Sequence, residues 1–168
     1  MPSPHGIPPD LFRPDGRLDI DLFAAGVPKI LDAAMRMAKK TRWDSLRSPH
    51  LFMGMLHHPD STLRRFAREM ELDFEQLQQT FEAMFHQPDG PVAPTLALNR
   101  EFLSDNLLRA LRAAQERCAD QGRDKITAMD LLLTLLTLAD SIIVECLRQL
   151  DLPLDELIHA AENIEKNP

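Results

Sequence analysis

The chain has few cysteines and no apolar segment of membrane-spanning length. Its two cysteines, Cys118 and Cys146, lie within apolar helical patterns and form no CxxC pair, so we expect small core residues in a reducing compartment. The longest apolar run, around 131–138, is far shorter than the roughly 20 residues needed to span a bilayer. Prolines near the N-terminus occupy the place where a signal peptide needs its apolar stretch. These absences predict a soluble, cytoplasmic protein.

Basic residues are fewer than acidic residues in this chain. The net charge is -7, so no global field attracts nucleic acid or an anionic membrane, and neither is an expected partner. Basic side chains gather only locally, within 36–42 and 64–68, and we interpret these clusters as solvated helix faces. None of the six glycines begins a G-x-x-x-x-G-K-[ST] loop, which excludes this kind of phosphate-binding loop for ATP. No cofactor is predicted.

The dominant positive feature is an internal repeat. A shift of 80 residues aligns 23–84 with 103–164 without a gap, and 12 of the 62 aligned pairs are identical. Many other pairs change residue but stay apolar, which is the kind of substitution that a packed core tolerates. The sequence therefore predicts two copies of one packing scheme.

Helix start signals divide each copy into four helices, and no strand pattern of period two appears. Apolar residues recur at spacings of three and four over 24–40, which indicates the first helix. Ser48 and Pro49 begin the second helix of the first copy. Its counterpart begins at Thr127, with Asp130 three residues later in a capping box. The prediction is an all-α domain of about eight helices.

The third and fourth helices begin at similar signals in both copies. Asp60 and Asp140 precede the third helix and are predicted to cap it. The fourth begins near Asp73 in one copy and near Pro153 in the other. We expect one domain made of an irregular tail (1–22), repeat 1 (23–85), a proline-containing linker (86–102) and repeat 2 (103–165).

The most diagnostic stretches are "SPHLFMGML" (Ser48–Leu56), "AAQERCADQGRDKITAMDLLLTLL" (Ala113–Leu136) and "LDLPLDEL" (Leu150–Leu157). With the double repeat, they resemble the N-terminal domain of the Clp/Hsp100 family of AAA+ unfoldases, from Phe23 to about Ile164. That resemblance implies a non-catalytic module that binds client or adaptor proteins for an ATPase ring. The ring is missing here, so we expect a free-standing relative or the N-terminal piece of a larger protein, and no enzyme.

The resemblance also implies candidate binding positions. Members that bind phosphoarginine use a glutamate just before the His-Leu start of the second helix. Pro49 and Met129 stand at these positions, so phosphoarginine binding is not expected. Other members accept unstructured segments in an apolar groove beside the first two helices of the second repeat. Leu111 and Ala113 match the polarity of that groove, and Asp130 makes one edge acidic.

Two further residues complete the candidate partner-binding set. Trp43 stands in the loop between the first two helices, where the second copy has Arg123, and it either caps the core or anchors a partner. His50 lies at the start of the second helix. A metal site formed by His50 with the His57–His58 pair is not expected, because adjacent histidines on a helix end point to different faces. No catalytic residue is predicted.

Three functions follow from the resemblance. The first is recruitment of clients or adaptors, with a peptide or partner helix docked between the repeats by anchors at i, i+3 and i+4. The second is the N-domain of a type VI secretion sheath-disassembly ATPase that binds a sheath helix. The third is a structural subunit that docks on a Clp protease or ATPase ring. For the first, we expect Leu111→Asp to weaken binding while the chain stays helical.

Overall fold

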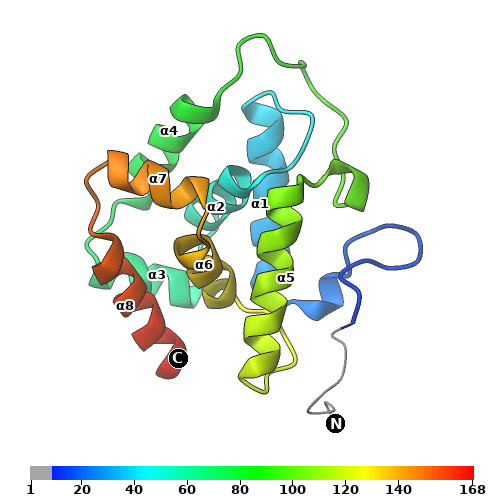
Figure 1. The fold of residues 1–168 in the computed structure, drawn as a ribbon. Coiled ribbons are helices and arrows are strands. Elements are labelled where there is room, and N and C mark those ends of the chain that lie inside the picture. The colour runs from blue at the N-terminus through cyan, green and yellow to red at the C-terminus, as the bar shows by residue number, and fades with distance from the viewer. Residues whose placement is uncertain (1–8) are drawn as a thin grey trace.

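The computed structural model describes residues 9–168, and the regular structure in this range is helical apart from isolated β-bridges (Figure 1). Two short 3-10 helices, Ile20–Leu22 and Arg100–Phe102, accompany eight α-helices. The α-helices are α1 (Val27–Lys40), α2 (Ser48–His57), α3 (Ser61–Glu69), α4 (Phe74–Phe85), α5 (Asp105–Asp120), α6 (Ala128–Thr137), α7 (Ile142–Gln149) and α8 (Leu154–Lys166). None of these helices is both long and apolar enough to cross a membrane.

Helices α1–α4 correspond to α5–α8 through the shift of 80 residues, and so do the two 3-10 helices. Short backbone pairings join the two repeats in a symmetric way. The Leu46 amide donates to the Phe102 carbonyl (2.7 Å), and the Ile126 amide donates to the Leu22 carbonyl (2.9 Å). The two bonds are equivalent, because Leu46 corresponds to Ile126 and Leu22 corresponds to Phe102 through the shift of 80 residues. The predicted all-α architecture of two pseudo-symmetric repeats is confirmed.

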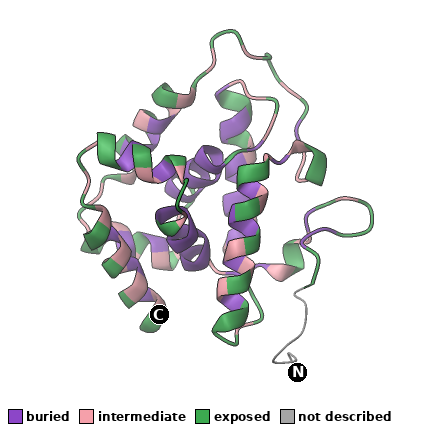
Figure 2. Cartoon of the chain, in the orientation of Figure 1, coloured by how far each residue is buried: buried purple, intermediate pink, exposed green. Residues whose placement is uncertain are grey.

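Helices α2 and α6 form the centre of the molecule. Both are buried along nearly their whole length, over 48–56 and 128–136, as Figure 2 shows. A helix that is apolar on all sides has to be covered on all sides. Accordingly α1 and α4 pack on α2, while α5 and α8 pack on α6.

The helix starts confirm most of the sequence signals. The Asp60 carboxylate accepts from the Leu63 amide (2.9 Å) and caps α3. The capping box of α6 is present, because Asp130 accepts from the Thr127 amide (2.9 Å) and the Thr127 hydroxyl accepts from the Asp130 amide (3.1 Å). The Asp140 prediction is wrong. Helix α7 begins one residue later than the repeat implies, so Ser141 takes the N-cap position.

The segment before α1 is packed rather than loose. Leu11, Phe12 and Leu18 are buried in the core. The Leu18 amide donates to the Leu98 carbonyl (2.7 Å), which ties the segment to the linker. This segment also contains a separate 3-10 turn, Ile20–Leu22. The predicted irregular tail also includes residues 1–8, which lie outside the described residues.

Candidate protein-binding site

Trp43 and His50 meet at the corner between α1 and α2. Their rings make an edge-to-face contact with centroids 5.6 Å apart. The Trp43 indole N–H donates to the Phe85 carbonyl (2.6 Å), so the half-buried ring is bound to its own chain at the end of α4. This contact fits the core-capping alternative for Trp43.

The His50 imidazole is 1% exposed and neutral. Its Nδ1 accepts from the Arg47 amide (3.0 Å), which leaves the proton on Nε2 to donate to the Thr41 hydroxyl (3.2 Å). Burial, aided by the nearby Arg47 charge, lowers the pKa of His50 to about 4. His50 therefore stabilises the start of α2 from inside the molecule.

Asp130 occupies the equivalent corner of repeat 2 and is 0% exposed. Its carboxylate accepts from both terminal nitrogens of Arg123 (2.5 and 2.6 Å). Arg117 lies 3.8 Å away and also pairs with Glu165 (2.8 Å). The hydrogen bond to Asp130 raises the pKa of Arg123. Asp130 is thus a paired internal charge and not an open acidic edge.

Leu111 and Ala113 both belong to α5, but their exposure differs. Leu111 is 0% exposed, within the core, whereas Ala113 is half-buried. An aspartate at position 111 would be an unpaired buried charge, so Leu111→Asp tests folding rather than binding. Partner binding through the five candidate residues stays a prediction, and three of them lie beneath the surface.

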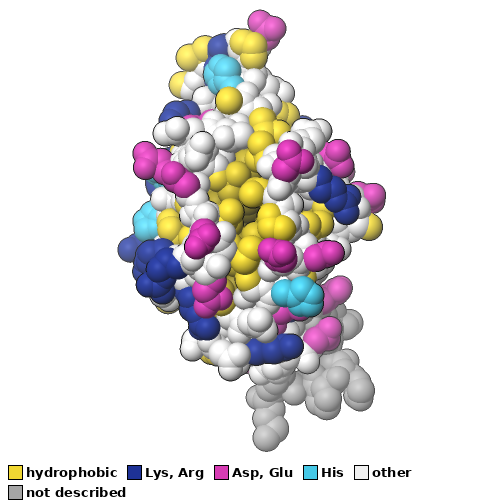
Figure 3. Space-filling view, turned by 90° about the vertical axis from the view of Figure 1, so that its left-hand side faces the viewer, with side chains coloured by type: hydrophobic (Ala, Val, Ile, Leu, Met, Phe, Trp, Pro, Cys, Tyr) yellow, Lys and Arg dark blue, Asp and Glu magenta, His cyan; other side chains and the backbone are white. Residues whose placement is uncertain are grey.

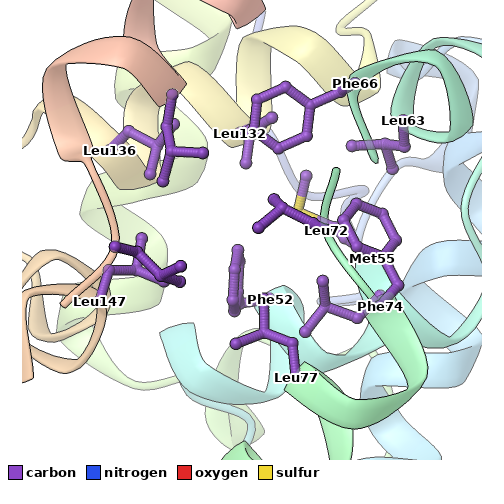
Figure 4. A pocket seen from close by; sticks show the side chains of 13 residues that line it. Phe52, Met55, Leu63, Phe66, Leu72, Phe74, Leu77, Leu132, Leu136 and Leu147 are labelled. Carbon is purple, nitrogen blue, oxygen red and sulfur yellow. The ribbon is translucent and has the colours of Figure 1, made fainter. Parts of the chain in front are cut away.

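A small apolar hollow of about 10 Å³ lies between the two repeats (Figure 4), and most of the side chains around it belong to the buried core. Figure 3 faces this side of the molecule and shows apolar side chains gathered in its middle. All the side chains that line the hollow are apolar. They are Phe52, Met55, Leu56, Leu63, Phe66, Leu72, Phe74, Leu77, Leu132, Leu136, Leu147, Leu152 and Leu157.

Sequence reasoning did not identify the hollow, although it found much of its lining. Three of the identical repeat pairs face it: Leu56/Leu136, Leu72/Leu152 and Leu77/Leu157. The repeat marked these positions as apolar and equivalent, which fits a closed core equally well. The signal available was the density of identical leucines in the second half of each repeat.

The two thiols are held in their protonated form. Cys118 donates to the Arg123 carbonyl (3.2 Å), and burial raises the pKa of Cys118. Burial likewise raises the pKa of Cys146. Both thiols are therefore poor nucleophiles at neutral pH. Within residues 9–168, no group of three or more histidine, cysteine or carboxylate side chains is arranged to hold a metal ion.

The fold and the paired repeats define a class of all-α double-repeat domains. The sequence matches the Clp repeat (R) N-terminal domain family over residues 23–150, and the chain belongs to that family. This confirms the resemblance found in the sequence. No curated protein matches the chain.

Solved structures agree on the fold. The N-terminal domain of the chaperone ClpD from Arabidopsis thaliana is similar with a TM-score of 0.68 and 16% identity, over 90% of this chain and 99% of that chain. The ClpV N-domain from Vibrio cholerae gives 0.63 and 18%, over 95% and 93%. A complex of a ClpV N-domain with a VipB peptide gives 0.64 and 17%, over 96% and 97%.

Proposed function

We propose that this chain is a non-catalytic protein-binding module that recruits client or adaptor proteins to a Clp-type AAA+ unfoldase. The apolar hollow between the repeats carries the proposal. An apolar hollow at the surface marks a place where apolar groups of another molecule can be received once the surrounding helices part. Leu72 and Leu152, both half-buried, lie at this hollow in equivalent loops of the two repeats.

Family membership supports this function, and so does the ClpV N-domain that was solved with a VipB peptide. The buried polar side chains at the two corners have partners within the chain, which suits structural roles for them. The ClpV likeness also favours a second candidate, the N-domain of a type VI secretion ATPase that binds one helix of a sheath protein. Preference for a single helix over unstructured segments distinguishes this candidate.

The test is a titration of the ¹⁵N-labelled chain with a library of apolar 15-residue peptides, followed by nuclear magnetic resonance. Binding should shift resonances around the hollow. Leu152→Gln should weaken binding about tenfold, or about 1.4 kcal/mol. Leu150→Gln is the matched control, because Leu150 is also half-buried in the same loop but does not line the hollow.

Two results would count against recruitment of clients. One is that no apolar peptide shifts these resonances. The other is stoichiometric binding of the chain to an ATPase ring without affinity for any peptide, which would indicate a structural docking subunit instead.

A further inference from the structure

The mouth of the apolar hollow carries charges of predominantly one sign. Two equivalent loops, α3–α4 and α7–α8, place Leu72 and Leu152 at the hollow. Around these loops, within 68–75 and 148–156, the sequence has seven carboxylates but only two arginines. Figure 3 shows acidic side chains around the apolar centre of this face and basic clusters nearer its edges. The apolar hollow therefore opens into an acidic rim.

All seven carboxylates of this rim are exposed, and one of them, Glu69, pairs with Arg65. Six of them form no ion pair within the described part of the chain: Glu71, Asp73, Glu75, Asp151, Asp155 and Glu156. Basic side chains of the chain therefore do not neutralise their charge, although the Asp73 carboxylate accepts a hydrogen bond from the Gln76 amide at the start of α4 (3.1 Å). Their charge remains available to a ligand, and at about 0.1 M salt it acts over roughly 10 Å.

Two of the carboxylates occupy backbone positions that ordinarily favour glycine or asparagine. Glu71 and Asp151 have φ angles of 52° and 56°, just after the ends of α3 and α7. A glycine at such a helix end avoids the steric conflict of a side chain. Both repeats have an acidic residue there, directly before the leucine that lines the hollow. Local backbone preference does not account for this acidic pair.

The walls of the hollow are joined more firmly on one side than on the other. Helix α3 packs against α8, and the Arg65 guanidinium donates to the Asn167 carbonyl at the C-terminal end. The equivalent pair, α7 and α4, forms no comparable interface. Access between α4 and α7 therefore requires fewer contacts to be broken than access between α3 and α8.

We propose that the hollow takes an amphipathic segment with basic flanks, which inserts its apolar side chains from the α4–α7 side. This rests on the proposed function and narrows it to a class of partner. The leucines and phenylalanines of the hollow supply the contact for the apolar anchors. Lysine or arginine beside the anchors pairs with the acidic rim, while an acidic segment meets like charges.

The test uses two synthetic 16-residue helical peptides with the same leucines at i, i+3, i+4 and i+7. One has lysine at its polar positions and the other has glutamate. Each is titrated into the ¹⁵N-labelled full chain at about 50 and about 300 mM salt. We expect the lysine peptide to bind at least about tenfold more tightly at low salt, and the ratio to fall toward one at high salt.

Two double variants locate the charge effect. Glu75→Gln with Glu156→Gln removes two rim carboxylates, and we expect it to weaken binding of the lysine peptide several-fold. The control, Glu116→Gln with Asp120→Asn, removes two exposed carboxylates from α5 and leaves the rim intact. If both variants weaken binding equally, the net charge of -7 explains the preference and the rim proposal is wrong.

The remaining outcomes separate this inference from the proposed function. Equal affinity for the two peptides at the hollow overturns the charge preference and leaves protein binding intact. Binding of other apolar segments, but of neither helical peptide, has the same meaning. If no apolar segment binds, both proposals fail.

Discussion

The two repeats cap the start of their central helix, α2 or α6, with different side chains. His50 and Asp130 are equivalent residues at the start of α2 and α6, and each accepts a hydrogen bond from the backbone amide three residues earlier. One acceptor is a neutral imidazole and the other is a carboxylate. What the two repeats share is therefore the capping of a buried helix, and the charge of the cap is free to differ.

The surroundings of each corner match the charge of its cap. In repeat 2, Arg123 pairs with Asp130, and Arg117 bridges to Glu165. The positions equivalent to these partners are neutral in repeat 1; they are Trp43, Met37 and Phe85. A buried charge is tolerated only with its partners in place, so a carboxylate in one corner requires the whole set.

A second difference lies in how closely the helices approach. Gly54 of α2 packs on α1, where a Cβ atom would come within 2.6 Å of the Ile30 carbonyl and 2.7 Å of the Ala34 nitrogen. The equivalent residue in α6 is Thr134. In repeat 1 the backbone of the second helix thus packs directly on the backbone of the first helix. Repeat 2 accommodates a side chain at the same position.

The largest expected effect on stability comes from removing the buried carboxylate at the start of α6. Asp130→Ala leaves the arginines without their buried partner and removes one half of the capping box. We expect a loss of about 4 kcal/mol in the free energy of unfolding, measured by urea denaturation at pH 7. Asp124→Ala, at an exposed residue nearby, is the control. A loss below about 1 kcal/mol would show that the ion pairs do not maintain this corner.

The next effect tests the close helix contact. Gly54→Thr introduces the residue of repeat 2 into repeat 1, where the backbone of α1 blocks it, and we expect a loss of about 3 kcal/mol. Thr134→Gly is the reciprocal control, with an expected loss of about 1 kcal/mol, mainly from the space left by the buried side chain and to a smaller extent from lower helix propensity. Equal losses in the two variants, by thermal or urea unfolding, would contradict the difference in packing.

The smallest expected effect is the pH dependence of stability that comes from the neutral His50 at the start of α2. His50 has a pKa of about 4 in the folded chain against 6.5 for the free side chain, so the unfolded state binds the proton first as the pH falls. Its contribution is complete above pH 6.5 and is lost on acidification toward pH 4. Linkage gives a decrease of roughly 2 kcal/mol at pH 5.

The measurement is a series of urea unfolding curves between pH 7.5 and 5. Carboxylates also titrate near the acidic end, so the comparison is with His50→Gln, which lacks the ionisable ring. The variant should lose stability less steeply than the natural chain over this range. Identical slopes would mean that His50 is not held neutral.

The positions of the helices followed from local signals. The repeat of 80 residues, the apolar spacing and the caps at Asp60 and Thr127 all concern residues a few positions apart, so sequence pattern alone locates them. The Asp140 prediction was wrong because α7 begins one residue later than the equivalent α3, a shift that the repeat pattern does not contain. There the Ser141 hydroxyl donates to the Leu135 carbonyl of the preceding helix.

The sequence also could not give the depth of individual residues. It marked Leu111 and Asp130 as groove residues by resemblance, whereas both are fully buried. Periodicity tells which side of a helix is apolar. It does not tell whether another element covers that side, because coverage depends on the distance and angle between helices.

The sequence by itself determined the family, the helical class and the duplication, since these are encoded in residue type and spacing along one chain. The tertiary structure decided that equivalent leucines of the two repeats meet around one small apolar hollow. It also decided that Asp130 is paired with Arg123, while six of the seven rim carboxylates have no ion-pair partner within residues 9–168. Both outcomes depend on the distances between side chains of separate segments, and these distances are set only when the segments pack in three dimensions.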